Sequence, residues 1–262
     1  MLAKFRKKVS KGSRFNQIYV PKSMENLVEV GDEVEVTLIR KHAELHLSKG
    51  LKLPHFKKGL IRDIFSFLDG IADASFIFVV GSFLTEKINY NDIDVVLITS
   101  SPDGKFEESV YNKIIERFNL KFHILALEEK RFRHLLEICP LTRAMLSNYV
   151  CNKPIAVADR RSIETKHIKF LLMMPYDLLE IKINSRAFYD SLRRLITIER
   201  FLRNKSLDMP EINEELEILV NAPLHDKIKR NEEIEDNSIK FLRKLIRAKL
   251  ELIEGLIKDG KK

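Results

Sequence analysis

Two apolar runs separated by a turn constrain the fold of this chain most. The first run is Phe78–Ser82, which ends in Gly-Ser, and the second is Asp92–Leu97, nine residues further on. Short apolar runs bounded by turn residues are typical of buried strands. Alternate residues of a strand point to the same face, so we expect Asp92 and Asp94 to project together. The sequence therefore predicts a sheet with two carboxylates at the start of one strand.

This carboxylate pair predicts a metal site beside a phosphate-binding turn. Two like charges so close repel each other unless a cation lies between them, and hard oxygen ligands favour Mg²⁺ or Mn²⁺. Gly81 lets the backbone approach a ligand closely, and a helix beginning at Ser82 would direct its free N–H groups at phosphate oxygens. Together these groups suit phosphoryl or nucleotidyl transfer. The alternative is an ordinary Gly-Ser turn followed by a strand with solvent-facing acids.

The order apolar-Gly81-Ser82, then Asp92-apolar-Asp94-apolar, resembles the signature of the DNA polymerase β-like nucleotidyltransferase superfamily, which includes the minimal nucleotidyltransferases. The resemblance covers residues 56–157 and implies a mixed α/β nucleotidyltransferase domain. It further implies that Gly81 and Ser82 bind a nucleoside triphosphate. Asp92 and Asp94 are then the catalytic residues that bind Mg²⁺ or Mn²⁺.

The chain departs from this superfamily at the usual third carboxylate, because the next strand, Lys121–Leu127, holds no acid. His123 stands about where that acid is expected. An imidazole there could act as a general base or a metal ligand, or it could be a packed strand residue without a catalytic role. Glu128 and Glu129, which follow the strand, are candidates for a displaced acid. Lys87, Lys121 and Arg143 are candidate cations for phosphate charge.

The first fifty residues predict a small β domain. Expected strands are 17–20, 33–39 and 42–47, and they are too short to bury a core without a partner. Two segments, Gln17–Lys22 and Val30–Val36, resemble the Ile-apolar-Pro-Lys and Gly-Asp steps of AbrB-like swapped-hairpin domains over residues 4–48. That resemblance implies an interlocked homodimer that often binds DNA. The alternative is a dimerisation or docking module.

The N-terminal segment is also basic: residues 1–58 hold thirteen Lys or Arg against six acids. Such an edge suits DNA or RNA phosphates. The candidate nucleic-acid-binding residues are Lys7, Lys8, Lys11 and Arg14.

Helical periodicity dominates the rest of the chain. Helices are expected at 58–70, 106–118, 128–138 and 141–149 around the strands, and beyond Asp159 at 186–203 and 238–257. The fold class is therefore an α+β multi-domain protein: a β domain (1–50), a nucleotidyltransferase domain (56–157) and a bundle of three or four helices (159–262). Arg161 and His167 have a spacing similar to the Arg…His pair of HEPN ribonucleases, a minor alternative.

The composition indicates the kind of partner and the cellular location. The net charge is +8 and the pI is about 9.3, which suits a phosphate-bearing partner. No apolar run approaches the length of a membrane span, and the two cysteines have no metal-ligand spacing, so we expect a cytoplasmic protein with no membrane association. Abundant Lys and Glu with a single glutamine resemble proteins of thermophiles.

Two functions from different classes follow. The first is a metal-dependent nucleotidyltransferase that moves a nucleoside monophosphate from a nucleoside triphosphate to an acceptor. The second is a DNA-binding regulator whose central domain only senses a nucleotide. The two differ in whether labelled nucleotide is transferred and whether Asp94→Asn removes the function.

Overall fold

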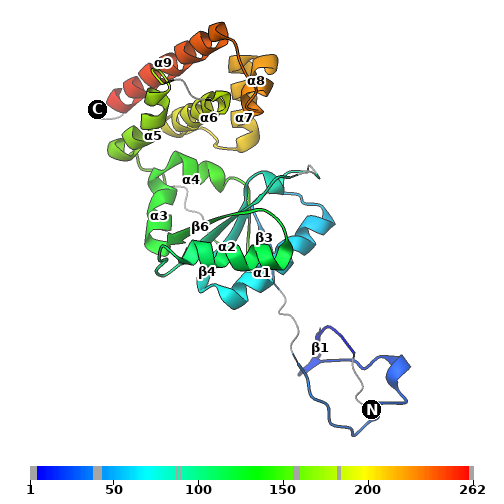
Figure 1. Ribbon diagram of the computed structural model, residues 1–262. Coiled ribbons are helices and arrows are strands. Elements are labelled where there is room, and N and C mark those ends of the chain that lie inside the picture. Colours follow the sequence, from blue (N-terminus) through cyan, green and yellow to red (C-terminus); the bar gives the residue numbers. More distant parts are fainter. Residues whose placement is uncertain are drawn as a thin grey trace. The chain divides into compact units, whose positions relative to one another are not determined.

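The computed structural model describes residues 5–37, 43–86, 88, 90–155, 160–181 and 184–259 (Figure 1). The chain forms two compact units, Met1–Lys41 and His42–Lys262. The larger unit is a mixed α+β structure with a five-stranded mixed sheet and a C-terminal helical region. None of the helices in the described ranges has both the length and the apolar composition needed to cross a membrane.

The N-terminal unit contains little regular structure. β1 (Ser10–Lys11) pairs antiparallel with β2 (Asn16–Gln17), and a 3₁₀ turn, η1 (Lys22–Met24), follows Pro21. The expected strand 17–20 is reduced to Gln17, and residues 33–37 form no strand; the remainder of the expected strand 33–39 lies outside the described residues. No residue between 5 and 37 is buried. This unit therefore has no core of its own among the residues described.

The central sheet has the strand order β3-β7-β4-β5-β6. These strands are β3 (His46–Leu47), β4 (Ala74–Val80), β5 (Ile93–Thr99), β6 (Phe122–Glu128) and β7 (Tyr149–Cys151). β4 is antiparallel to β5 and β7, whereas β5 and β6 are parallel. The expectation that 42–47 continues the N-terminal β pattern is wrong for His46 and Leu47, because β3 pairs with β7 at the edge of this sheet.

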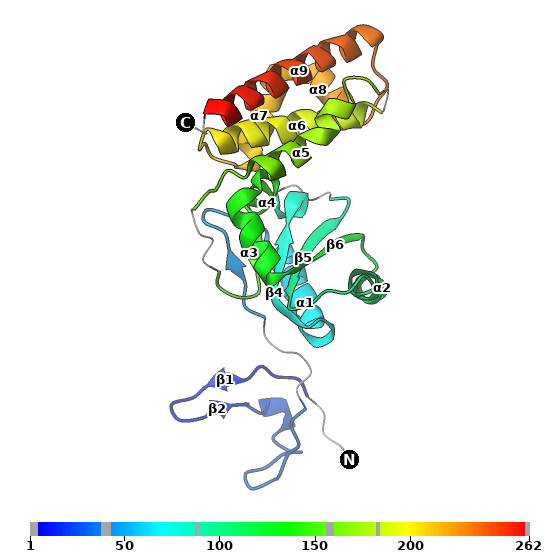
Figure 2. The same cartoon turned by 90° about the vertical axis from the view of Figure 1, so that its left-hand side faces the viewer.

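Alternate strand residues build two cores, one on each face of the sheet. Helices α1 (His55–Ile71) and α2 (Phe106–Phe118) pack on one face, where Ile77 and Val95 are buried. Helix α3 (Glu129–Ile138) covers the other face, where Phe78 and Val96 are buried (Figure 2). Each fully buried large apolar side chain stabilises the fold by about 1.5–3 kcal/mol.

Helix α4 (Pro140–Met145) leads back to the sheet and is shorter than the expected helix 141–149, because strand β7 begins at Tyr149. The helices expected at 58–70, 106–118 and 128–138 are confirmed by α1, α2 and α3.

The C-terminal region is helical as expected. The described residues hold five helices there rather than three or four: α5 (Thr165–Asp177), α6 (Ser185–Leu202), α7 (Met209–Val220), α8 (Ala222–Lys229) and α9 (Asp236–Asp259). Pro210 and Pro223 lie in the first turns of α7 and α8, where proline is tolerated, whereas Pro175 lies inside α5.

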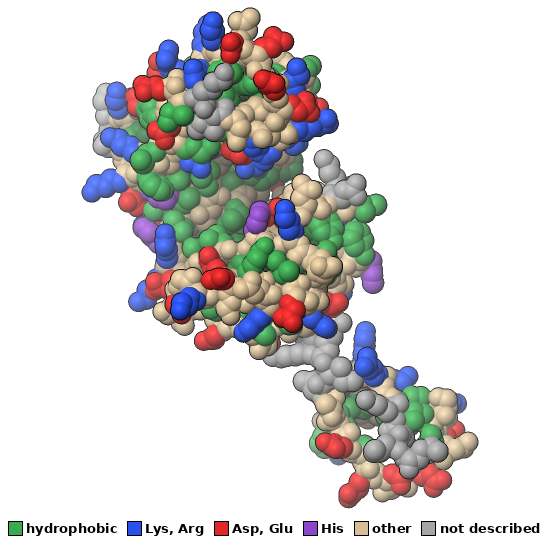
Figure 3. Space-filling view, viewed as in Figure 1, with side chains coloured by type: hydrophobic (Ala, Val, Ile, Leu, Met, Phe, Trp, Pro, Cys, Tyr) green, Lys and Arg blue, Asp and Glu red, His purple; other side chains and the backbone are tan. Residues whose placement is uncertain are grey.

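Helix α6 is the centre of this region, since its apolar face is buried along most of its length. Ion pairs join α6 to its neighbours: Arg200 pairs with Glu211 and Glu215, and Lys249 Nζ lies 2.5 Å from Glu199 Oε2. Acidic and basic side chains are interspersed over the visible face of the bundle (Figure 3).

Candidate active site

Strand register brings the predicted site residues together at one end of the strands. Val80, the last residue of β4, lies opposite Asp94 of β5, and Asp94 lies beside His123 of β6. The Gly81 turn, the start of β5 and the start of β6 are therefore neighbours. Asp94 points to the face of the sheet on which Val96 is buried, the face covered by α3. Asp92 immediately precedes β5.

Asp92, Asp94 and His123 form a compact cluster on this face. His123 Nδ1 lies 3.2 Å from Asp94 Oδ1 and 3.6 Å from Asp92 Oδ2. One ligand atom from each residue can be chosen so that all three atoms lie within 4.8 Å of one another. The side chain of His123 is 69% exposed, so it is not part of the packed core, and those of Asp92 and Asp94 are 26% and 35% exposed. The cluster is thus open on one side to an incoming ligand.

The electrostatics of the cluster favour a bound cation. Burial raises the pKa of Asp94 above its ordinary value, the hydrogen bond from His123 lowers this pKa, and the charge of Asp92 raises it. The net upward shift means that a second negative charge is disfavoured here without a cation. Two carboxylates and one imidazole can hold Mg²⁺ or Mn²⁺ and leave positions open for phosphate oxygens, so the residues fit the expected metal.

Gly81 is required by both its conformation and its surroundings. Its φ is +78°, a left-handed conformation that costs glycine little. A Cβ atom at this position would lie 2.1 Å from Asp94 Oδ2. The glycine therefore lets the turn approach the carboxylate cluster more closely than any other residue would.

Ser82 is exposed in the turn that follows. The helical element considered at Ser82 is a single 3₁₀ turn, η2 (Gly81–Leu84), which begins one residue earlier. The Thr85 N–H and hydroxyl both donate to the Ser82 carbonyl, at 3.2 and 2.9 Å, and close this turn. Ser82 thus offers a hydroxyl and backbone N–H groups to a ligand, without the dipole of a long helix.

Lys57 supports this turn and was missed by the sequence reasoning. It is fully buried in α1, and its ammonium group donates to the carbonyls of Phe83 and Thr85, each at 2.7 Å. Burial lowers the pKa of Lys57. A signal was present in the sequence: Lys57 falls on the apolar stripe of α1, four residues before Ile61, where an unpartnered charge would be costly.

The other candidates from the sequence are placed as follows. Glu128 lies opposite Thr99 at the far end of β6, about 16 Å from His123 at the usual rise per residue. Glu129 begins α3 beside Glu128 and pairs with Arg133. Neither glutamate can replace the missing third acid, because the parallel strand carries both away from the cluster.

Lys121 is exposed at the edge of the cluster, and its carbonyl accepts from the Ile93 N–H. Lys87 lies outside the described residues. Lys7, Lys8, Lys11 and Arg14 are exposed in the N-terminal unit, which is a separate body from the cluster.

Comparison with known proteins adds no relative: no family model, no curated protein and no solved structure matches the chain. The geometry of the site is therefore the basis for the functional proposal. It comprises an open cluster of two carboxylates and an imidazole beside a glycine turn braced by a buried lysine.

Proposed function

We propose that the protein is a metal-dependent nucleotidyltransferase, and that Asp92 and Asp94 bind Mg²⁺ or Mn²⁺ together with a nucleoside triphosphate. The observation that carries the proposal is the close approach of the Gly81 turn to Asp94, because it joins a turn suited to phosphate to a pair of metal ligands. Neither feature alone would favour this activity, since isolated acids and Gly-Ser turns are common.

In the proposed reaction, an acceptor hydroxyl oxygen bonds to the α-phosphorus while the bond from that phosphorus to the bridging oxygen breaks. Pyrophosphate leaves, and the hydroxyl proton passes to a base or to water. The metal, when bound, would neutralise charge on the phosphates and lower the pKa of the hydroxyl. Ser82 donates its hydroxyl to a phosphate oxygen, and Lys57 keeps the turn in place by holding the carbonyls of Phe83 and Thr85.

The main test is calorimetric titration of ATP, GTP, CTP and UTP with and without Mg²⁺. We expect at least one nucleotide to bind only with the metal present, and Asp92→Ala to weaken this binding about tenfold or more, because one of two charged ligands is lost. Asp69→Ala is a suitable control, since Asp69 lies at the exposed end of α1. Absence of metal-dependent binding would refute the proposal.

Transfer is measured separately with labelled nucleotide and candidate hydroxyl acceptors. Nucleotide binding without any transfer would instead favour the regulator, in which the central domain only senses the nucleotide.

His123 is proposed to complete the metal site in place of the third carboxylate, because its ring nitrogen already lies against both aspartates. We expect His123→Ala to weaken Mn²⁺ binding about tenfold and His123→Asp to restore or strengthen Mg²⁺ binding, since oxygen ligands suit Mg²⁺ better. The measurement is metal titration in the absence of nucleotide. Equal affinities in all three proteins would show that His123 is not a ligand.

The N-terminal unit is proposed to form a homodimer that contacts nucleic acid. Its apolar side chains are exposed rather than buried: they are Val9, Phe15, Ile18, Tyr19, Val20, Leu27, Val30, Val34 and Val36. Pairing with a second copy would bury them. We expect light scattering to give twice the chain mass for the full chain and the single mass after removal of residues 1–41. A monomeric full chain would exclude this assembly.

A further inference from the structure

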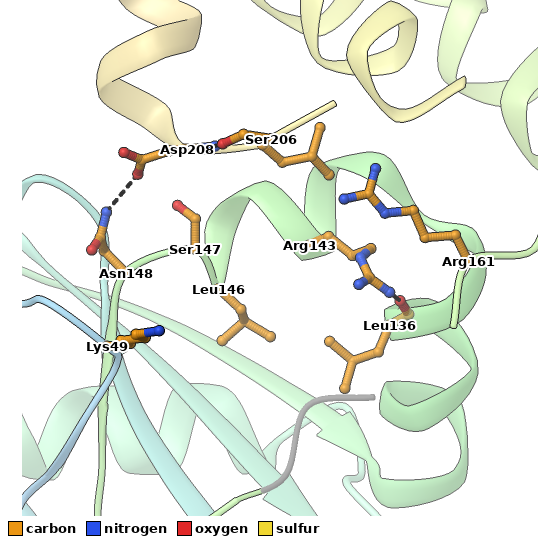
Figure 4. Close-up of a pocket in the computed structure, with 10 residues that line it drawn as sticks. Lys49, Leu136, Arg143, Leu146, Ser147, Asn148, Arg161, Ser206 and Asp208 are labelled. Carbon is orange, nitrogen blue, oxygen red and sulfur yellow. Dashed lines mark hydrogen bonds between the residues drawn. The ribbon is translucent and has the colours of Figure 1, made fainter. Parts of the chain in front are cut away.

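A cavity of about 340 Å³ opens at the same end of the strands as the carboxylate cluster. Its polar lining includes Lys49, Arg143, Ser147, Asn148, Arg161 and Asp208 (Figure 4). Leu136 and Leu146, which also line it, belong to the core on the α3 face of the sheet, the face to which Asp94 points. The cavity and the cluster therefore lie at the same end of the strands and on the same face of the sheet.

Strand order gives the lateral spacing between the Asn148 side of the cavity and the strand that carries Asp94. Asn148 precedes β7, whose first residue, Tyr149, lies opposite Val80. The neighbouring Ser48, which precedes Lys49, donates its N–H to the Tyr149 carbonyl. Adjacent strands are about 4.8 Å apart, so β7 lies two spacings, about 10 Å, from β5 and Asp94. A ligand in the cavity could thus extend a reactive group to the metal cluster.

The cavity has a positive end and a polar end. Figure 4 shows Arg143 and Arg161 together at one end, and Asn148 joined to Asp208 at the other. The Asn148 side-chain amide donates to Asp208 Oδ1 at 3.0 Å. This bond orients an amide and a carboxylate where a ligand's donors and acceptors could reach them.

The arginines are held in place through carbonyl oxygens. Arg143 Nη1 donates to the carbonyls of Leu136 and Arg160, at 2.8 and 3.0 Å. Arg161 Nη1 donates to the Lys205 carbonyl at 3.0 Å, and its guanidinium lies 5.7 Å from the centre of the Phe201 ring. The carbonyl orients the Arg161 guanidinium without cancelling its charge. Within the described residues, Arg161 and Lys49 form no ion pair with a carboxylate.

The Ser147 hydroxyl is an independent indication that a ligand binds in the cavity. Its hydroxyl oxygen is buried, lines the cavity and has no hydrogen-bond partner among the described residues. Buried hydroxyls are normally satisfied, because leaving one unpaired costs about 1–3 kcal/mol.

We propose that this cavity is the acceptor subsite and binds one nucleotide unit, with its phosphate at the Arg161 end and the rest of the unit extending toward Lys49 and Asn148. This inference rests on the proposed function. The volume lies in the range of small-molecule sites, and guanidinium groups are the preferred partners of phosphate. The unit could be a free nucleoside monophosphate or the end of a nucleic-acid strand, since both present the same phosphate.

The test is metal-free binding to the full chain in the presence of a chelator. The two probes are AMP and a single-stranded RNA hexamer, each titrated at low and at moderate salt. We expect binding that weakens with salt and that Arg161→Gln weakens about tenfold or more, with a smaller loss for Arg161→Lys. Arg247→Gln, an exposed arginine of α9, is the matched control and should bind as the native chain does.

Lys49→Gln provides a second variant, and it removes no side-chain hydrogen bond or ion pair within the described part of the chain. A loss of binding in this variant, with an unchanged melting temperature, supports the subsite. Binding by the hexamer alone assigns the site to a strand end, and binding by both probes assigns it to the nucleotide unit itself.

The inference would be overturned if Lys49→Gln and Arg161→Gln bound the probes as tightly as Arg247→Gln and the native chain do. It would also be overturned if the native chain bound neither probe. Because the chelator removes divalent metal, a failure of the Asp92–Asp94 site would leave this result unaffected. The two proposals can therefore fail separately.

Discussion

Replacing Asp94 with asparagine should abolish nucleotide transfer and, in metal-free buffer, stabilise the fold. The amide keeps the shape of the side chain but is a poor ligand for Mg²⁺, so we expect transfer to fall about a thousandfold or more. The burial and the Asp92 charge that raise the pKa of Asp94 oppose its ionisation in the folded state. Removing the charge removes that opposition, and the melting temperature should rise by about 1–3 °C.

The stabilising effect has a defined pH dependence. The folded-state pKa of Asp94 lies above its ordinary value of 3.8, so the folded protein holds this proton to a higher pH than the unfolded chain does. Stability of the native protein therefore falls as pH rises from about 4 through the folded-state pKa, and the penalty is complete above it. His123 and Asp92 face Asp94 and are present in both proteins, so the two proteins differ only at Asp94.

Thermal denaturation between pH 4 and pH 8, in the presence of a chelator, measures this difference. The melting temperature of Asp94→Asn should exceed that of the native protein by an amount that grows with pH. Added Mg²⁺ should raise the melting temperature of the native protein alone. An asparagine variant that melts below the native protein at pH 8 would show that Asp94 stabilises the fold by itself. The cluster would then be a structural ion pair with His123 rather than a metal site.

The sequence predicted the central domain closely because its elements are stabilised by local patterns. The apolar run Asp92–Leu97 overlaps strand β5 (Ile93–Thr99), and helix α2 has the expected bounds, 106–118. Apolar runs and a 3.6-residue period mark them without ambiguity. The resemblance to the nucleotidyltransferase superfamily put His123 about where a third acid is expected, and the pairing of β5 with β6 sets His123 beside Asp94.

Long-range contacts set the limit of what the sequence could predict. His46 and Leu47 continue an N-terminal pattern in the sequence, yet they pair with β7 about a hundred residues further on. Lys57 braces the Gly81 turn through carbonyls 26 and 28 residues away. A buried lysine is placed by partners rather than by its neighbours in the chain, so only its position on an apolar stripe could have revealed it.

The cavity was missed for the same reason. Arg143 and Arg161 were each noticed in the sequence, but for different chemistry and in different domains. Lys49 was part of the expected N-terminal β domain (1–50). Only the fold brings the start of β7, the end of α4 and the segment after α6 to one place.

Replacing Gly81 with alanine should greatly reduce nucleotide transfer, although the substitution adds only one methyl group. The left-handed backbone at φ +78° costs a non-glycine residue about 1–2 kcal/mol. In addition, the new methyl group would lie 2.1 Å from Asp94 Oδ2, so either the turn or the carboxylate must move. A displacement near 1 Å of a metal ligand can reduce a rate about a hundredfold, and we expect at least this loss of transfer.

Gly50→Ala separates the two causes, because the φ of Gly50, +83°, is close to that of Gly81, and a Cβ atom added at Gly50 would meet nothing within 4 Å. We expect Gly50→Ala to lower the free energy of unfolding by a similar 1–2 kcal/mol, roughly, while transfer stays at the native rate. If Gly81→Ala likewise lost only stability, the close contact with Asp94 would have no role in catalysis. A selective loss of transfer, with the metal-free melting temperatures of the two variants alike, would instead assign the contact to the reaction. It would do so because backbone strain is then the same in both proteins and only the approach to Asp94 differs.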